Sequence, residues 1–323
     1  MESFFKYFRN SRRLGQTIIY IVTLLVFVFF CLVLPGFFSF DTARAILIQM
    51  TYICILGLGL TFILTIGEID ISIAAQVAVP SCLLAILLRS GVPLIISFIA
   101  ALSIVMLLGF LNGFMMVRLK IPSFIMTLGT YGIAQGLSRI FANNSPIKVE
   151  NEFITFLFGG ELFGMPKMVY WLGFLTIIAY FILHKTKYGR NLHCIGDNSK
   201  AALLYGINVN KTIIFAFIIS SVFAFFVAML DLGKTSYANP GFAEPFLLSA
   251  IIAPVIGGTS LQGGKGDVIG TFIGALFLTI VSVGLFHLGF STWFNKIITG
   301  IFIIVLLIFS GLMEKWKREM ESI

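Results

Sequence analysis

Residues Lys185–Lys211 read K-T-K-Y-G-R-N-L-H-C-I-G-D-N-S-K-A-A-L-L-Y-G-I-N-V-N-K, a polar segment between two long apolar runs. Its basic residues are Lys185, Lys187, Arg190, Lys200 and Lys211. Asp197 is its single acid. The small residues of Ala201–Tyr205, followed by Gly206, predict a short helix, because glycine commonly ends helices. A membrane protein that exposes such a helix has a candidate docking surface here.

The composition of the whole chain indicates a membrane protein. The 323 residues are 59% hydrophobic and 11% charged, and the mean hydropathy is +1.03. Soluble domains carry about 25% charged residues, so an ordinary water-soluble fold is excluded. The first apolar run, Thr17–Leu34, is long enough to span a bilayer. No small-x-small cleavage site follows it, so we interpret it as an uncleaved first helix rather than a signal peptide.

Apolar runs separated by polar segments predict an all-α, polytopic membrane fold that forms a single transmembrane domain over residues 1–323. A helix needs about 20 apolar residues to cross the hydrocarbon core. About ten apolar runs meet or approach that length. The predicted helices are 17–35, 46–66, 71–88, 92–117, 122–141, 168–184, 212–231, 246–258, 267–287 and 293–312.

The basic residues predict the orientation, because cytoplasmic loops are enriched in lysine and arginine. Placing both termini inside puts fifteen of the 22 basic residues in the cytoplasm. They are Lys6, Arg9, Arg12, Arg13, Arg118, Lys120, the five of the opening segment, Lys265, Lys315, Lys317 and Arg318. Segment 185–211 is then a cytoplasmic loop, and 142–167 and 232–245 are extracytoplasmic loops. The formal charge of +8 therefore reflects orientation, and no nucleic-acid partner is expected.

Two carboxylates occur at or near membrane depth in Gly67–Ser72, between the second and third predicted helices. Such groups are costly in a bilayer unless they face protein or a water-filled path. One interpretation is a short turn in which Asp70 or Ser72 caps the next helix. The other gives Glu68, Asp70 and Ser72 a role in lining the path or locking helices together. The sequence leaves both open.

The fifth apolar run contains two helical stripes of small or polar residues. Ser123, Thr127, Thr130 and Ala134 form the first. Gly129, Gly132 and Gly136 form the second, on which another backbone can approach closely. Tight helix packing is the commoner use of such stripes, whereas the hydroxyls and Gln135 favour a hydrophilic passage. In the preceding helix Asn112 lies between Gly109 and Gly113, with the same two interpretations.

A glycine-rich loop, Gly257–Gly266, precedes the ninth predicted helix. Thr259 stands where the Walker pattern requires glycine, and Gly266 stands where it requires a hydroxyl, so no nucleotide-hydrolysing site is predicted. The glycines instead predict a tight turn where the eighth and ninth helices approach; they are Gly257, Gly258, Gly263, Gly264 and Gly266. Scattered cysteines and histidines predict no metal site and no catalytic centre.

Several motifs, in order along the chain, together resemble permease subunits of bacterial ABC importers for ribose and related monosaccharides, including those for xylose, galactose and autoinducer-2. The family pattern G-G-I-D-L-S-V-G corresponds to Gly67–Ala74, and P-x-F-I-x-T-L-G-T to Pro122–Thr130. The pattern R-x-G-R-x-x-x-A-x-G-x-N corresponds to Lys187–Asn198. G-I-N-V-N-K occupies Gly206–Lys211, and G-G-T-S-L-x-G-G-K-G is complete at Gly257–Gly266.

The resemblance implies an assembly in the bacterial cytoplasmic (inner) membrane. Two permease chains, identical or different, form one path through the lipid bilayer. ATP-binding subunits, which hold ATP and Mg, lie beneath them, and an extracytoplasmic sugar-binding protein delivers the solute. The opening segment then corresponds to the coupling element that contacts the ATPase. The residues carried over to that role are Arg190, Gly196, Asn198, Ala201, Ala202, Gly206 and Asn208.

The chain departs from the family pattern in three places. Ser199-Lys200-Ala201 replaces E-A-A, so no carboxylate contact to the ATPase is carried over. Glu68 and Ala74 replace glycines near Asp70, and Pro245–Ile252 lacks both acids of the family's G-Y-E-L-D-A-I-A. These changes suggest a heterodimer as a hypothesis. An ion-coupled secondary transporter using Glu68 and Asp70 is the alternative function.

Overall fold

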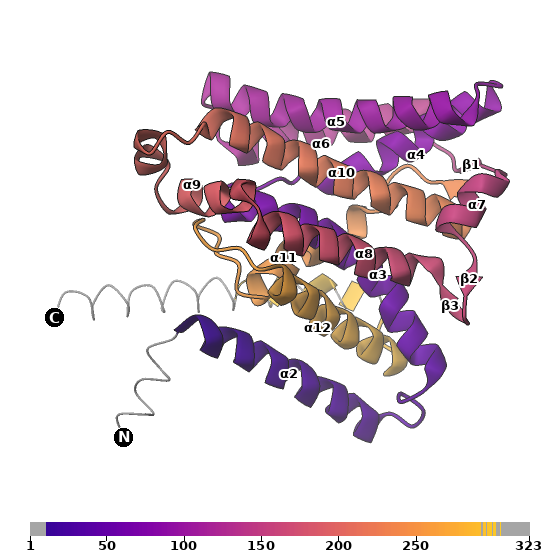
Figure 1. Ribbon diagram of the computed structural model, residues 1–323. Coiled ribbons are helices and arrows are strands. Elements are labelled where there is room, and N and C mark those ends of the chain that lie inside the picture. The colour runs from indigo at the N-terminus through magenta and orange to yellow at the C-terminus, as the bar shows by residue number, and fades with distance from the viewer. Residues whose placement is uncertain (1–10, 292, 295, 299, 302–303, 305–323) are drawn as a thin grey trace, which may run out of the picture.

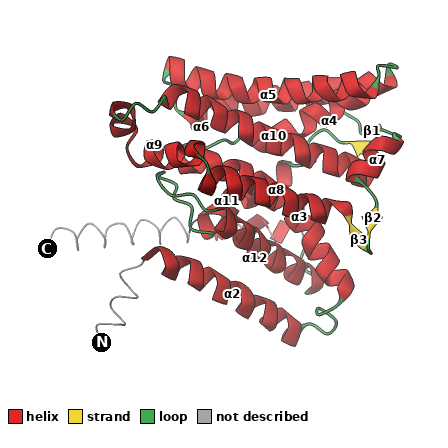
Figure 2. Cartoon of the chain, in the orientation of Figure 1, coloured by secondary structure: helices red, strands yellow, loops and turns green. Residues whose placement is uncertain are grey.

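The computed structural model describes residues 11–291, 293–294, 296–298, 300–301 and 304. In this part of the chain helices dominate, and the strands have two residues each (Figures 1 and 2). The elements are α2 (Ser11–Val33), α3 (Phe40–Thr65), α4 (Ile73–Arg89), α5 (Leu94–Leu119), α6 (Ser123–Ala142), β1 (Ile147–Lys148), α7 (Glu152–Phe158), β2 (Glu161–Leu162), β3 (Met165–Pro166), α8 (Lys167–Tyr180), the π-helix η1 (Phe181–Lys185), α9 (Lys187–Leu204), α10 (Val209–Thr235), β4 (Tyr237–Ala238), the 3₁₀ turn η2 (Glu244–Phe246), α11 (Leu247–Ile256) and α12 (Val268–His287).

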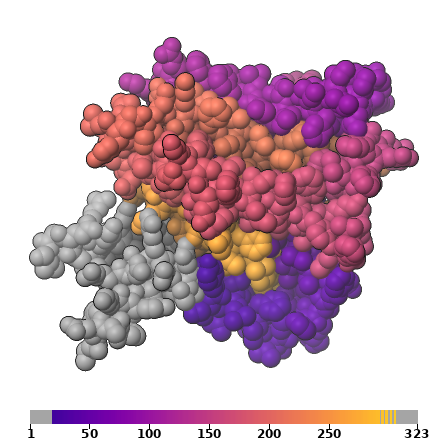
Figure 3. Space-filling view, in the orientation of Figure 1, coloured from indigo at the N-terminus to yellow at the C-terminus, as the bar shows by residue number. Residues whose placement is uncertain are grey.

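Five of the described helices are long and apolar enough to cross a membrane by length and composition: α3, α5, α8 with η1, α10 and α12. The most apolar window of α3 is 83% buried, against 28% for α5. The structure therefore has α3 at its centre, packed against α10, α11 and α12, while α5 lies at an edge. On the molecular surface in Figure 3, α5 lies at the top and α2 at the bottom.

Nine of the ten predicted ranges overlap a described helix. The prediction of a helical, membrane-type fold is confirmed. The tenth range, 293–312, lies largely outside the described residues, so the number of spans and the side on which the termini lie stay predictions. Helix α3 begins at Phe40, six residues before its predicted start, because Ser39 caps it by accepting a hydrogen bond from the Thr42 amide.

The polar segment 185–211 is more helical than its sequence predicts. The range of α9 covers 18 residues as two helices that meet at a kink at Asn198, where φ is −157° and ψ is 101°, and the predicted short helix at 201–205 lies largely in the second of them. Gly189, Leu192, Ile195 and Ala202 form its buried face. This stripe at helical spacing packs the segment onto the bundle and explains why a mostly polar sequence is helical.

The two predicted extracytoplasmic loops meet at one end of the molecule. β1 and β4 pair in antiparallel fashion, with Ile147 opposite Ala238 and Lys148 opposite Tyr237. The short helix α7 and the β2–β3 hairpin lie at the same end, and α9 lies at the opposite end (Figure 1). Arg44 at the start of α3 forms an ion pair with Glu161 of the hairpin. The described bundle thus has two chemically different ends.

Glycines allow two pairs of helices to approach closely. A Cβ at Gly109 would lie 2.7 Å from the Phe217 carbonyl oxygen of α10, and one at Gly257 would lie 2.1 Å from the Gly270 carbonyl carbon of α12. The other stripe behaves differently. At Gly129, Gly132 and Gly136 a Cβ would meet nothing within 4 Å. The close backbone approach predicted for this stripe is absent from the described single chain.

Candidate functional site

The predicted path residues around Asp70 form a buried hydrogen-bond network. The amide and hydroxyl of Ser72 both donate to Asp70 Oδ1, at 2.9 and 2.5 Å. This local turn follows from sequence, because an Asp side chain readily binds the amide two residues later. Helix α4 begins directly after Ser72, whose own side chain makes no capping bond. Asp70 therefore orders the turn that leads into α4.

Side chains from three helices complete this network. The Asn112 amide donates to Ser72 Oγ at 2.9 Å, and Thr130 Oγ1 donates to Asn112 Oδ1 at 2.5 Å. Gln76 also donates to Ser72 Oγ, at 2.7 Å. Asp70, Ser72 and Asn112 are completely buried. The network thus joins the turn to α4, α5 and α6 through side chains that are sealed from solvent.

The hydroxyl stripe of α6 holds the same turn by its backbone. Ser123 Oγ accepts from the Ile69 amide, and Thr127 Oγ1 accepts from the Ile71 amide, both at 3.2 Å. Backbone amides in a membrane interior need partners, which these hydroxyls supply. This geometry favours the helix-locking interpretation of the turn. Glu68 is half-buried beside it, and a path-lining role for these residues stays a prediction.

The sequence predicts Gln135 in the same hydrophilic passage as the hydroxyl stripe, but in the structure Gln135 lies outside the Asp70 network. Its amide donates to Tyr131 Oη at 2.9 Å and to Glu244 Oε1 at 2.7 Å. Arg139 lies 3.5 Å from the same carboxylate. Gln135 therefore contacts the rim of a separate cavity rather than the Asp70 network.

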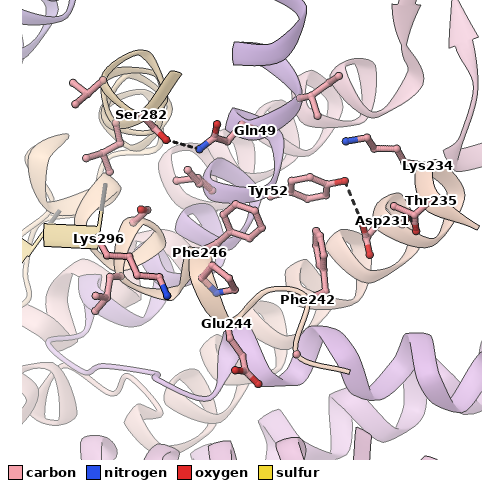
Figure 4. A pocket seen from close by; sticks show the side chains of 18 of the residues that line it. Gln49, Tyr52, Asp231, Lys234, Thr235, Phe242, Glu244, Phe246, Ser282 and Lys296 are labelled. Carbon is pink, nitrogen blue, oxygen red and sulfur yellow. Dashed lines mark hydrogen bonds between the residues drawn. The ribbon is translucent and has the colours of Figure 1, made fainter. Parts of the chain in front are cut away.

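That cavity, which we call the α3–α10 pocket, has a volume of about 810 Å³. It lies between α3, α10, α12 and residues 241–249 (Figure 4), and Tyr131 of α6 also lines it. Asp231, Lys234 and Thr235 line it from the last turns of α10, which lead into β4. The pocket is therefore in the half of the bundle that carries the paired strands β1 and β4.

Aromatic rings and a few polar groups shape the pocket. The rings of Tyr52 and Phe246 stack with centroids 5.5 Å apart, and Phe242 meets Tyr52 edge-on at 5.0 Å. Tyr52 Oη donates to Asp231 Oδ1 at 3.4 Å, and Lys234 Nζ lies 5.7 Å from the Tyr52 ring centroid. Convergent polar groups in a largely apolar cavity are typical of small-molecule sites.

Sequence analysis did not identify Tyr52 and Asp231. A signal was present, since an ionisable residue inside a predicted spanning helix is a functional-site hypothesis. Asp231 is the last residue of the predicted range 212–231, where it reads as a helix end. Tyr52 reads as one more apolar residue of its run. In the structure the two side chains form a hydrogen bond although they are 179 residues apart in the sequence.

At the other end, glycines lock α9 onto the bundle. A Cβ at Gly196 would lie 2.0 Å from the Thr65 carbonyl oxygen and 2.3 Å from the Gly264 amide nitrogen. Gly264 N donates to the Thr65 carbonyl at 2.9 Å, and His193 Nδ1 lies 3.1 Å from the Gly264 carbonyl oxygen. Three segments, the end of α3, the loop 257–266 and α9, therefore meet through backbone atoms.

The same loop depends on its other glycines. Gly258, Gly263 and Gly264 have φ values of 93°, 89° and 76°, a backbone conformation that residues other than glycine rarely adopt. A Cβ at Gly266 would lie 1.9 Å from Thr65 Oγ1. The turn predicted from these glycines thus contacts α3 as well as α11 and α12.

The second half of α9 projects from the bundle. Asn198 Oδ1 accepts from the amides of Lys200 and Ala201, which starts this half as a capped helix. Its tip consists of Leu203, Leu204 and Tyr205, which are 64%, 89% and 87% exposed. Gly206, at a φ of 79°, ends it. We call residues Leu203–Tyr205 the α9 tip.

The coupling residues predicted from the resemblance have different places in this structure. Arg190 and Asn198 are exposed and Ala201 is half-buried, whereas Ala202 is buried against the bundle. Gly196 forms the backbone contact with Thr65, and Asn208 caps α10 by accepting from the Lys211 amide. The apolar side chains of the tip were not among the predicted residues. Their signal was weak, because leucines in a short helix usually face a core.

The comparisons with known proteins cover most of the chain. Residues 42–307 match the family described as branched-chain amino acid transport system, permease component. The chain is 33% identical over 296 residues to a probable ABC transporter permease protein of Escherichia coli (strain K12), which covers 91% of this chain and 89% of that protein. No solved structure matched the chain.

Two further relatives carry substrate names. The chain is 31% identical over 275 residues to the ribose import permease protein of Escherichia coli (strain K12), covering 84% of this chain and 86% of that protein. It is 28% identical over 312 residues to the fructose import permease protein of Rhizobium meliloti, covering 94% and 86%.

Proposed function

The chain belongs to the family described as branched-chain amino acid transport system permease components, and from this premise we propose that it is the membrane-spanning permease subunit of an ATP-driven importer for a monosaccharide. The similarity to permeases for ribose and fructose import supports a sugar. The family description names an amino acid system, so L-leucine is the competing solute. The solute crosses the membrane chemically unchanged.

The α9 tip is the docking element for a separate ATPase subunit. The observation that carries this assignment is the combination of an exposed apolar tip with a rigid root. Leu204 and Tyr205 expose most of their surface at a polar end of the bundle, and exposed apolar patches rimmed by polar residues mark protein contacts. ATP and Mg belong to that partner, since the chain has no Walker pattern.

A mechanical route leads from the tip to the spanning helices. Closure of the ATPase subunits around ATP displaces the α9 tip. Because Gly196 contacts Thr65 and Gly264 through backbone atoms, α9 passes its movement to α3 and to the loop that precedes α12. These helices also line the α3–α10 pocket. A displacement at one end therefore changes a cavity in the other half of the bundle.

The orientation and the partners follow the charge pattern. The end with the α9 tip faces the cytoplasm, in agreement with the basic residues of segment 185–211. The opposite end, with α7 and the paired strands, receives a sugar-binding protein. A second permease chain completes the path. The unfilled space beside Gly129, Gly132 and Gly136 supports a helix contact outside the single chain.

The docking assignment is tested by co-purification of the permease with its ATPase. Leu204→Glu places a charge on the apolar tip without touching the buried face of α9, so we expect normal insertion and loss of the ATPase. Phe163→Asn is the matched control, because Phe163 is 91% exposed in the hairpin at the opposite end. Retention of the ATPase by Leu204→Glu at the level of Phe163→Asn contradicts the assignment.

The energy source has its own test. Uptake into vesicles must require ATP and persist when ion gradients are collapsed. Uptake that continues without ATP and stops with the ion gradient would favour the secondary transporter.

A further inference from the structure

We propose that the α3–α10 pocket is a binding site for the transported solute and takes an uncharged, polyhydroxylated ring. The proposal rests on the proposed function and adds the place and the chemistry of recognition inside this chain. Neither the match of residues 42–307 nor the names of the relatives assign a role to any pocket residue. Its support is the shape, the ring surfaces and the charge balance of the pocket.

The position of the pocket fits an entry site. Its walls come from the first half of α3, the last turns of α10, α12 and residues 241–249. The end of α10 continues into β4, which pairs with β1 across the two outer loops. A volume of about 810 Å³ lies within the range of about 300–1,000 Å³ that is usual for small-molecule sites. The pocket is thus large enough for a single sugar ring with water.

The aromatic residues supply a surface for the apolar face of such a ring. Phe242, Phe246 and Tyr52 all line the cavity; the two phenylalanines are half-buried and Tyr52 is 3% exposed. Contacts between Tyr52 and both phenylalanine rings hold the cluster together. A sugar presents C–H groups on one face and hydroxyls around its edge. The face of one aromatic ring fits the C–H groups, and the polar groups of the pocket fit the hydroxyls.

The polar groups supply both kinds of hydrogen-bond partner that a hydroxyl needs. Asp231 and Glu244 provide carboxylate acceptors, and Lys234 provides ammonium donors. Gln49, whose amide donates to Ser282 Oγ at 2.9 Å, offers its carbonyl oxygen as a further acceptor. Figure 4 shows these groups around the same space. The pocket therefore offers both donors and acceptors to the hydroxyls of a ring.

The charge balance of the wall favours an uncharged solute. The ionisable lining residues with formal charges are Asp231, Glu244, Lys234 and Lys296, so the two acids and two lysines cancel. Glu244 has further partners in Arg139 and Gln135. A solute with net charge would lose its hydration without an excess of opposite charge. A zwitterion is the remaining competitor, because Asp231 and Lys234 are neighbours.

The first experiment measures protection of a cysteine in the pocket. Ser249 lines the cavity, so Ser249→Cys is the test variant. Ser145 is exposed in an outer loop, and Ser145→Cys is the matched control. Both are made in a Cys31→Ser, Cys194→Ser background, which removes the two cysteines that are not buried. The assembled permease–ATPase complex in nanodiscs is labelled with a maleimide in the presence of D-ribose, D-fructose or L-leucine.

We expect one of the sugars to slow labelling of Ser249→Cys several-fold and to leave Ser145→Cys unchanged. Protection by L-leucine and by neither sugar overturns the assignment of a polyhydroxylated ring. Equal labelling with and without each solute, in a complex that imports one of them, overturns the pocket as its site.

The second experiment separates this proposal from the proposed function. Uptake is measured at saturating binding protein for the parent complex and for Phe246→Ala and Asp231→Asn. We expect at least a tenfold lower rate with ATPase co-purification unchanged. If the parent complex imports no sugar, the proposed monosaccharide function fails and the pocket assignment fails with it. Sugar import by the parent at a rate that both variants retain overturns the pocket assignment alone.

Discussion

Gly196→Ala adds one methyl group where α9, the end of α3 and the loop 257–266 meet. The new Cβ would lie 2.0 Å from the Thr65 carbonyl oxygen, although real Cβ contacts are essentially never shorter than 3.0 Å. The neighbouring atoms must therefore separate by about 1 Å. On both sides these neighbours are backbone atoms, which cannot yield as a flexible side chain would. The root of α9 has to move instead.

The expected cost follows from overpacking. Inserting a group into a well-packed site typically costs about 1–3 kcal/mol. The same movement strains the bond from Gly264 N to the Thr65 carbonyl, which is 2.9 Å long. Because about 1.4 kcal/mol corresponds to a factor of ten, the state in which α9 is seated becomes about 5- to 150-fold less favoured. The route from the ATPase to α3 weakens by the same factor.

Two measurements follow the effect, namely thermal unfolding of the purified permease and ATP-driven uptake by the assembled complex. We expect normal insertion, a lower unfolding temperature, and uptake reduced about 5- to 150-fold by the estimated cost. Gly173→Ala in α8 is the matched control, because a Cβ there meets nothing within 4 Å. Alanine in a helix interior is more stable than glycine by about 0.5–1 kcal/mol, so the control should not lose stability.

If Gly196→Ala unfolds at the same temperature as Gly173→Ala and transports at the parent rate, the close contact at the root of α9 is not required. A lower unfolding temperature with normal transport would keep the packing argument and refute the mechanical one.

Four further substitutions test the network and the α9 tip. Asn112→Leu removes the amide that binds the hydroxyls of Ser72 and Thr130. Hydrogen bonds between membrane helices contribute about 0.6 kcal/mol each, with a maximum of about 1.7. We therefore expect the free energy of unfolding, measured by denaturant titration, to fall by about 1–3 kcal/mol. Asp70→Asn keeps one side-chain oxygen that can accept from the amide and hydroxyl of Ser72, whereas Asp70→Ala removes both bonds. We therefore expect the unfolding temperature of Asp70→Ala to fall below that of Asp70→Asn, and the reverse order would contradict the network. Gly206→Pro forces φ from 79° to about −65°, so we expect membrane insertion with lost uptake and ATPase activity that no longer responds to solute; unchanged uptake would contradict the coupling role of the tip.

The helical membrane fold could be predicted from sequence because hydropathy accumulates along a continuous run of residues. The apolar runs that form α3, α5, α10 and α12 could each be predicted from their own residues, without reference to the helices that they contact. The glycine-rich turn at 257–266 was also readable, since positive φ values at Gly263 and Gly264 demand glycine locally. The length of α9 was not, because only packing of Leu192 and Ile195 onto the bundle makes its polar sequence helical.

The pocket could not be predicted, because its residues are distant in sequence. Tyr52 lies on α3, Asp231 on α10 and Phe246 at the end of η2, and each lies in or beside a run typical of an ordinary spanning segment. Likewise, Gly109 and Gly129 have similar small-residue spacing, yet only Gly109 meets another backbone in the described chain.

The sequence by itself thus determined the membrane class, the position of most described helices and the polar segment from which α9 forms. Only the tertiary structure decided which polar groups are sealed in the Asp70 network, which line the α3–α10 pocket, and which leucines protrude from α9. The physical reason is that partition into a bilayer depends on the composition of one segment, whereas burial and cavities depend on which segments meet.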